Sequence, residues 1–151
     1  MALFGQNGKE EPTIVKQMSE MGFKAQVLGF AGAGEAPDYL PIAGKAAEGT
    51  IYSSGTFDME SREPKVQEFV QKFKQRYGKN PGLFAATHYD AVYIIAQAIE
   101  KGDFTAEGLK KGLMEIKDFP GITGKTTFTA TGDADKPLIL KTIRDGRPVV
   151  Y

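Results

Sequence analysis

The chain has 151 residues, of which 41% are apolar and 25% charged, and its 19 lysines and arginines equal its 19 aspartates and glutamates in number. This composition is typical of a globular domain with a buried core, and no apolar run approaches the roughly 20 residues of a membrane-spanning helix. The interleaved charges argue against a nucleic-acid partner, and the absence of cysteine excludes disulfides and thiolate metal sites.

Strand and helix signals alternate along the first third of the chain. Apolar spacing and turn residues predict, in order, a strand at 2–5, a helix up to Gly22, a strand at 25–30, a short helix at 37–43 and a strand at 49–53. The glycine-rich residues 29–34 form a loop after the second strand. Alternation of this kind predicts a parallel sheet covered by helices.

The rest of the chain contains predicted helices followed by short strands. After a polar, aperiodic stretch, the pattern predicts helices at 64–77, 81–102 and 105–116, and then β-rich runs at 125–129, 138–142 and 149–151. Thr105 is the expected N-cap of the third helix. The expected buried stripe of the second helix consists of Tyr89, Val92, Ala96 and Ile99, and Tyr93 and Ile95 widen it. Turn residues between the β-rich runs predict antiparallel hairpins.

The side chains that could carry catalysis do not form a recognisable set. His88 is the only histidine, and Asp90, two residues away, points in a different direction on a helix. No histidine accompanies Ser53, Ser54 or Ser61 as it would in a hydrolase triad. Four carboxylates are interpreted as solvated residues at helix starts, which the helix dipole favours: Glu10, Glu11, Glu60 and Glu63. We therefore predict a protein that is not an enzyme and that holds no cofactor and no metal.

Polar residues and glycines follow two of the predicted strands. Residues 29–34 lack the glycine spacing of a dinucleotide-binding loop, but ligands of open α/β sheets sit at the carboxyl ends of strands, where this loop lies. Gln6 and Asn7 precede a helix whose first N–H groups lack partners, and amide side chains at such a helix start can hold a carboxylate or a hydroxyl. Ordinary turn chemistry explains Gln6 and Asn7 equally well.

Several segments follow one another in a specific order along the chain. They are NGKEEPTIVKQMSEMGFKAQVLGF, IAGKAAEGTIY, FVQKFKQRYGKNPGLFAATHYDAVYIIAQAI, and FPGITGKTTFTATGD with IRDGRPVVY. The signals within them are AAEG, a helix ending in YG-x-x-P, then YDAV, and then G-x-TG with a following GD. Together they resemble the type I periplasmic solute-binding proteins of ABC importers, especially the branched-chain amino acid (Leu/Ile/Val) branch. The resemblance covers essentially the whole chain, but only the C-terminal portion of such a protein.

The resemblance implies an α/β fold that is truncated relative to the two-lobed family. A flavodoxin-like lobe of parallel β-α units would be followed by C-terminal antiparallel hairpins. By analogy, residues 1–57 correspond to the later part of the second lobe, 58–118 to helices that return to the first lobe, and 119–151 to the closing β-hairpins. We expect these parts to form one compact unit here, or a swapped homo-oligomer that covers the exposed helices, because apolar helix faces are unfavourable in water.

In the family, two lobes close on a small solute and deliver it to a membrane permease. The resemblance therefore implies a fragment of a periplasmic or extracytoplasmic protein that captures a small polar or amphipathic, amino acid-like molecule for an ABC importer. The residues MALFGQNG lack the pattern of a signal peptide, so we expect a parent protein to supply its signal elsewhere. The alternative is a stand-alone excised or engineered α/β module with a structural or oligomeric role and no ligand capture.

The resemblance also implies ligand-binding residues, namely Gln6, Asn7 and Ala31 on one lobe and Phe84 on the other. Asn7 stands where relatives have a tyrosine, and Phe84 retains the family's aromatic side chain. Relatives that bind leucine-type amino acids have an acidic residue at the position of Ala31, where it pairs with the amine of the ligand. The alanine weakens the assignment of a leucine-like ligand, unless Glu35 or another carboxylate takes over this role.

Overall fold

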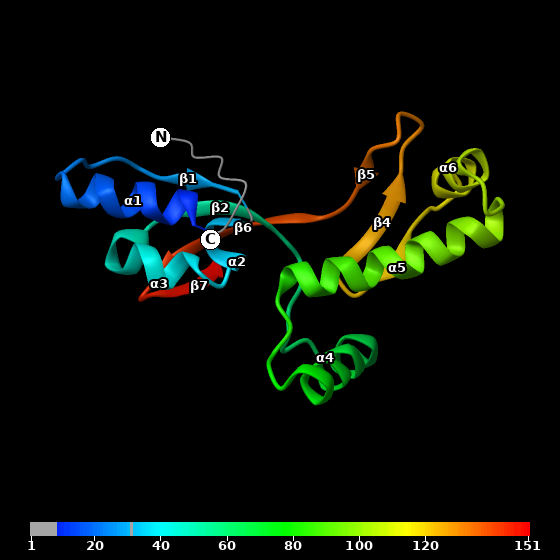
Figure 1. Cartoon of the computed structure of the whole chain (residues 1–151), viewed down its shortest axis with the longest axis horizontal. Helices are drawn as coiled ribbons and strands as arrows, with labels where there is room; N and C mark the ends of the chain where they lie inside the picture. The colour runs from blue at the N-terminus through cyan, green and yellow to red at the C-terminus, as the bar shows by residue number, and fades with distance from the viewer. Residues whose placement is uncertain (1–8, 31) are drawn as a thin grey trace. The chain divides into compact units, whose positions relative to one another are not determined.

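The computed structural model describes residues 9–30 and 32–151, which form two compact units (Figure 1). Unit 1 comprises the described residues up to Gly55 together with Leu138–Tyr151, and unit 2 is Thr56–Pro137. The chain therefore crosses from one unit to the other after Gly55 and again after Pro137. Residues 119–137 lie in unit 2 with the preceding helices, whereas the sequence-based division grouped them with the last strands. The correspondence of these parts with lobes of a larger protein stays a prediction.

Unit 1 contains a four-stranded sheet and several helices. Its elements are α1 (Glu10–Glu20), β1 (Leu28–Gly29), α2 (Gly32–Glu35), α3 (Tyr39–Ala43), the 3₁₀ helix η1 (Gly44–Ala47), β2 (Ile51–Gly55), β6 (Leu138–Arg144) and β7 (Arg147–Val150). The strand order is β1-β2-β6-β7, with β1 and β2 parallel and the other pairs antiparallel. The predicted parallel sheet is thus a mixed sheet among the described strands, because the end of the chain returns to pair with β2.

The hairpin between β6 and β7 closes through Asp145 and Gly146. Both residues have positive φ, as a tight two-residue hairpin turn requires. The carboxylate of Glu48, just after η1, accepts a hydrogen bond of 3.0 Å from the Asp145 N–H and fastens this turn to the helical side of the unit. The prediction of a C-terminal antiparallel hairpin is confirmed.

The core of unit 1 lies between one face of the sheet and the helices. The buried side chains that form it are Val15, Met18, Val27, Tyr39, Ala43, Ala47, Tyr52 and Ile143. Glu11, in the first turn of α1, is only 2% exposed, so the prediction that it is a solvated residue is wrong. The reason is that α1 turns Glu11 and Pro12 toward the same side as its buried apolar residues.

Unit 2 contains three helices and a small antiparallel sheet. Its elements are α4 (Pro64–Tyr77), α5 (Leu83–Lys101), α6 (Ala106–Met114), β3 (Phe119–Gly121), β4 (Gly124–Phe128) and β5 (Ala134–Asp135). Thr105 caps α6 as predicted, because its hydroxyl accepts a 3.0 Å hydrogen bond from the Gly108 N–H. α4 begins with Pro64 and ends before Gly78, whose φ of +68° is the left-handed conformation that terminates helices.

Helix α5 buries a different face from the predicted one. The buried residues are Leu83, Ala86, Asp90, Ile94 and Ala98, whereas Val92 of the predicted stripe is 66% exposed. Small residues explain the difference, since Ala98 of α5 lies directly against Gly112 of α6. Apolar side chains consequently remain exposed on the rest of α5: Phe84, Val92, Tyr93 and Ile95.

Candidate functional site

The structure describes one of the four residues predicted to bind ligand. Phe84 lies in the first turn of α5, its side chain is 46% exposed, and its carbonyl oxygen lies 2.6 Å from Nδ1 of His88. Gln6, Asn7 and Ala31 lie outside the described residues. The predicted set of four therefore stays a prediction, with Phe84 available as an exposed aromatic surface.

The carboxyl ends of β1 and β2 meet at one edge of the unit 1 sheet, because these strands are parallel. Glu35 lies at this edge, at the end of the short helix that follows β1, and Ser54 is the penultimate residue of β2. The Ser54 hydroxyl donates a 2.9 Å hydrogen bond to Oε1 of Glu35. The Lys141 ammonium, from β6, lies 2.7 Å from the same oxygen. Glu35, Ser54 and Lys141 are named the edge cluster here.

The edge cluster is largely shielded from water. The side chains of Lys141 and Glu35 are 16% and 13% exposed. A carboxylate that shares one oxygen between a hydroxyl and an ammonium is held more firmly than a solvated one, since charge-assisted hydrogen bonds are the strong ones. Lys141 therefore already neutralises part of the charge of Glu35. A ligand amine at Glu35 would share the carboxylate with Lys141.

Tyr52 lies beside the edge cluster in the core of unit 1. It is 1% exposed, and its hydroxyl makes no hydrogen bond of good geometry with any described residue. Burial, and secondly the negative charge of Glu35, raise the pKa of Tyr52. A Cβ on Gly34 would lie 2.2 Å from the tyrosine hydroxyl oxygen, so only glycine permits α2 to approach Tyr52 this closely. The edge therefore combines hydroxyls, a carboxylate and an ammonium around a close backbone approach.

Sequence reasoning named Glu35 as a substitute carboxylate but missed Ser54 and Lys141 as its partners. Glu35 and Lys141 are 106 residues apart in sequence, so no local pattern connects them. One signal was present, because Lys141 interrupts the apolar run of β6 at a position that alternates with exposed residues. A lysine at an inward-facing strand position usually has a carboxylate partner.

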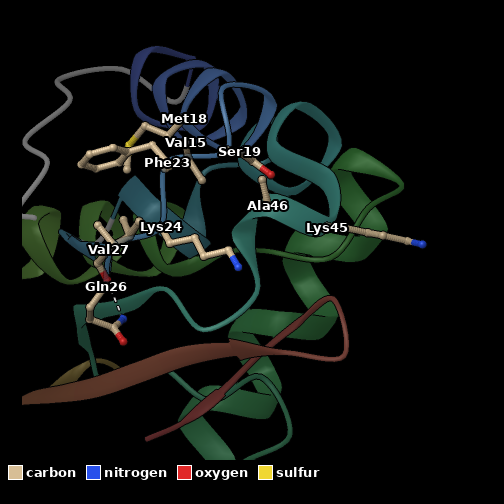
Figure 2. A pocket seen from close by; sticks show the side chains of 11 residues that line it. Val15, Met18, Ser19, Phe23, Lys24, Gln26, Val27, Lys45 and Ala46 are labelled. Carbon is tan, nitrogen blue, oxygen red and sulfur yellow. Dashed lines mark hydrogen bonds between the residues drawn. The ribbon is translucent and has the colours of Figure 1, made fainter.

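A hollow of about 610 Å³ lies elsewhere in unit 1 (Figure 2). It is lined by residues of α1, by residues 22–27 and by Lys45 and Ala46, and Figure 2 shows Lys45 pointing away from the other side chains. Residues 22–27 precede β1, so this hollow lies at the amino end of that strand. Ligands of open α/β sheets sit at the opposite edge, and we therefore assign the candidate site to the edge cluster.

In unit 2 a smaller cavity of about 320 Å³ is lined partly by Tyr89 and Tyr93 of α5. The rings of these tyrosines lie 4.8 Å apart. A hydrogen bond with Tyr93, and then burial, raise the pKa of Tyr89 to about 12.

No group of three or more His, Cys, Asp or Glu side chains in residues 9–30 and 32–151 is arranged to hold a metal ion. In that same part of the chain, no helix is long and apolar enough to cross a membrane.

A family model described as periplasmic binding protein matches residues 2–147 of this chain. Among curated proteins, the leucine-, isoleucine-, valine-, threonine-, and alanine-binding protein of Pseudomonas aeruginosa is 30% identical over 132 residues, and a Leu/Ile/Val-binding protein of Rhizobium johnstonii is 26% identical over 132 residues. Each match covers 86% of this chain, but only 34% and 35%, respectively, of those proteins. The chain thus spans about a third of the length of these curated relatives.

Solved structures give the same result for the fold. A leucine-binding protein from Thermotoga maritima has a TM-score of 0.83 at 27% identity, over 99% of this chain and 43% of that chain. A branched-chain amino acid substrate-binding protein from Streptococcus pneumoniae, in complex with isoleucine, has a TM-score of 0.78 at 28% identity, over the same shares of 99% and 43%. Both structures contain more than twice the length of polypeptide found here.

Proposed function

Because this chain belongs to the periplasmic binding protein family, we propose that it is part of an extracytoplasmic solute-binding protein that captures an amino acid-like molecule for an ABC importer. The family resemblance and the α/β class predicted from the sequence are confirmed. The observation that carries the proposal is the match over residues 2–147, together with relatives named as binding proteins for branched-chain amino acids. Solute binding, rather than catalysis, is the role of this family.

The proposed solute has charged or hydrogen-bonding groups at one end and an apolar part at the other. The polar end would be bound near the edge cluster, where Glu35, Ser54 and Lys141 supply a carboxylate, a hydroxyl and an ammonium. Gln6, Asn7, Ala31 and Phe84 are kept as proposed contacts of the solute. Because Lys141 already forms an ion pair with Glu35, we propose that the site binds a carboxylate or hydroxyl group of the solute at least as well as its amine.

The proposed parent protein is longer than this chain. Support comes from exposed apolar surface in both units: Val92 and Ile95 on α5, and Leu138 and Leu140 on β6. Burial of such surface is worth about 25 cal/mol per Å², so it is unfavourable for these side chains to stay in water. In the proposed parent, additional polypeptide covers them, and the assembled protein works in the periplasm with a membrane permease as its partner. A stand-alone oligomeric module is the alternative, in which a second copy covers the same surface.

Titration of the isotopically labelled chain, followed by NMR, tests the proposal. Leucine, isoleucine, valine, alanine and small carboxylates added to millimolar concentration should shift amides near the edge cluster and in residues 6–7 and 31, whereas glucose and a nucleotide should not. Ser54→Ala should weaken these shifts, and Ser53→Ala, one residue away on the other face of β2, should not. Absence of any shift with amino acids and carboxylates, or shifts confined to residues 18–27, would refute the assignment.

Calorimetry adds a quantitative test of the fragment. Because the chain spans only about a third of its curated relatives, we expect its affinity for any such solute to be weak, with no heat of binding at micromolar concentrations. Micromolar binding by the isolated chain would contradict this expectation while supporting the solute class. Light scattering then separates the two ways of covering the apolar surface, since a tight dimer favours a second copy.

A further inference from the structure

The chain passes between the two units twice. On the unit 2 side, both connecting segments contact the same turn. This turn, residues 122–123, joins β3 to β4. At the first crossing, the Thr56 hydroxyl donates a 2.9 Å hydrogen bond to the carbonyl oxygen of Thr123. At the second crossing, the Lys136 ammonium donates a hydrogen bond to the Thr123 hydroxyl. Thr123 is therefore bonded to both segments that connect the units.

Gly124 allows the two segments to lie this close to the turn. Its φ of +92° is a conformation that residues with a side chain rarely adopt. A Cβ at this position would lie 2.7 Å from Cγ of Pro137 and 2.9 Å from Oγ1 of Thr56. Both the backbone conformation and the space around it thus require glycine, and the second requirement comes from the crossing segments themselves.

Asp90 of α5 holds the turn in place. Its Oδ1 accepts a 2.9 Å hydrogen bond from the Ile122 N–H, and its Oδ2 accepts one of 2.9 Å from the Thr123 N–H and another from the Thr123 hydroxyl. The Lys136 ammonium lies 3.8 Å from Oδ2. Asp90 is only 2% exposed, so these partners replace water. All of them are donors, and an ionised carboxylate accepts through both oxygens, whereas an amide would present its own N–H groups to them.

We infer that Asp90 is a positioning residue for bending between the units, because through Thr123 it fixes the unit 2 ends of both crossing segments. A hinge absorbs its backbone changes at a few residues. With Thr56 and Lys136 fastened to a turn that is anchored on a 19-residue helix, the bend is confined to the residues on the unit 1 side of these two anchors. The inference rests on the proposed function, because the family resemblance implies two lobes that close on a solute, but it concerns bonds whose effects are measurable without a solute.

The inference also gives a physical role to two sequence motifs. Asp90 is the acidic residue of YDAV, and Ile122 and Thr123 are the central residues of G-x-TG. Ile122 and Thr123 are 32 and 33 residues from Asp90 in the sequence, and the hydrogen bonds described above join them to it. Neither motif contributes a residue to the edge cluster, so solute contact does not account for them.

Hydrogen exchange on the full chain tests the anchoring. Asp90→Asn should accelerate exchange of the Ile122 and Thr123 amides by about tenfold or more, because both donate to the Asp90 carboxylate and the loss of a hydrogen bond to a charged group has an effect of that order. Asp103→Asn is the matched control, since Asp103 also accepts a backbone N–H and a threonine hydroxyl, both from Thr105, in the same unit. It should accelerate exchange only around the start of α6.

A distance measurement tests the bending directly. The chain has no cysteine, so Lys16→Cys in unit 1 and Lys110→Cys in unit 2 give two unique, exposed sites for spin labels. The distribution of label-to-label distances should broaden in Asp90→Asn. Asp103→Asn should leave the width unchanged.

Thr123 variants keep the test decisive if Asp90→Asn fails to fold. Thr123→Val removes the hydroxyl at nearly constant shape and should broaden the distance distribution, while Thr123→Ser keeps the hydroxyl and should restore the original width. An unchanged width in Thr123→Val overturns the inference. Exchange that rises uniformly across unit 2 in either variant also overturns it, because that result is expected of a merely structural residue. Failure of solute binding would leave these measurements unaffected.

Discussion

Gly112→Ala sets helix propensity against packing, and the structure predicts which of the two effects is larger. Alanine is favoured over glycine inside a helix by about 1 kcal/mol, so α6 alone would become more stable. In the folded chain, however, the new Cβ would lie 1.9 Å from the carbonyl oxygen of Ala98 and 2.7 Å from its carbonyl carbon. Ordinary contacts of a Cβ lie between 3.4 and 4 Å.

The atoms in the way belong to the backbone of α5, so they cannot rotate aside as a flexible side chain would. α6 would have to move away from α5 and loosen the packing of Ile94, Ala98 and Ile116, which form one buried cluster. Overpacking of this kind typically costs about 1 to 3 kcal/mol and occasionally more. Since about 1 kcal/mol of that cost is offset by the gain in helix propensity, we expect a net loss of up to about 2 kcal/mol.

Equilibrium unfolding in urea, followed by circular dichroism and by hydrogen exchange of the α6 amides, measures this loss for unit 2. Lys111→Ala is the control, because Lys111 is an exposed neighbour in the same helix and its replacement should change stability by less than about 0.5 kcal/mol. A Gly112→Ala variant that is more stable than the original chain by about 1 kcal/mol would show that propensity outweighs the contact. That result would refute the close α5–α6 approach.

Three further predictions follow from the exposed face of α5, the buried tyrosine and the edge cluster. Val92→Glu should reduce hydrophobic-dye fluorescence and self-association without lowering the melting temperature, and unchanged light scattering would show that this face is not in contact with a second copy. The contribution of Tyr52 to stability should be fully present below the ordinary tyrosine pKa of about 10 and should be lost as the pH rises above it, because the pKa of Tyr52 is raised on folding. Tyr52→Phe should make that loss shallower in urea titrations at increasing pH. Glu35→Gln and Lys141→Met should each cost about 1 to 3 kcal/mol, and their effects should be clearly less than additive in a double-mutant cycle, whereas additivity would show that the pair is not coupled.

Local signals in the sequence were sufficient for most helix ends. α4 has the predicted bounds because proline is favoured in a first turn and because Gly78 adopts the left-handed conformation that ends a helix. Thr105 caps α6 through a hydrogen bond that spans only three residues. The β6–β7 hairpin depends on two adjacent turn residues. Each of these features is determined by neighbours in the sequence, and a single sequence contains that information.

The buried face of α5 was not predictable from its own sequence. Apolar residues occur around most of this helix, so periodicity allows more than one buried stripe. The choice depends on Gly112, whose lack of a side chain allows α6 to lie against the small residues of α5. The mixed sheet has a similar cause, because the pairing of β6 with β2 joins residues that are far apart in the sequence. Such contacts are determined by the fold as a whole.

The candidate site was predictable only as a place, the carboxyl edge of the parallel strands. The rule that ligands sit at this edge requires only β1 and β2, which the sequence indicates. The partners Lys141 and Ser54 depend on β6 returning to that edge, and Asp90 meets Ile122 and Thr123 through an equally distant contact. In the sequence, the potential partner near Asp90 is His88, and residues two apart on a helix point in different directions. That rule is correct, but it says nothing about partners elsewhere in the chain.

The buried charges and the exposed apolar surfaces of this chain lead to one conclusion about its function. Asp90 and Glu35 are ionisable groups in low-exposure positions, and each is stabilised by partners that come from distant parts of the described chain. By contrast, the apolar face of α5 and the leucines of β6 remain largely exposed among the described residues. A chain with exposed apolar faces is expected to gain stability from added polypeptide that covers those faces. On the proposed function, the polypeptide that covers these faces would also complete the solute site, so stabilisation and solute affinity should increase together when it is supplied.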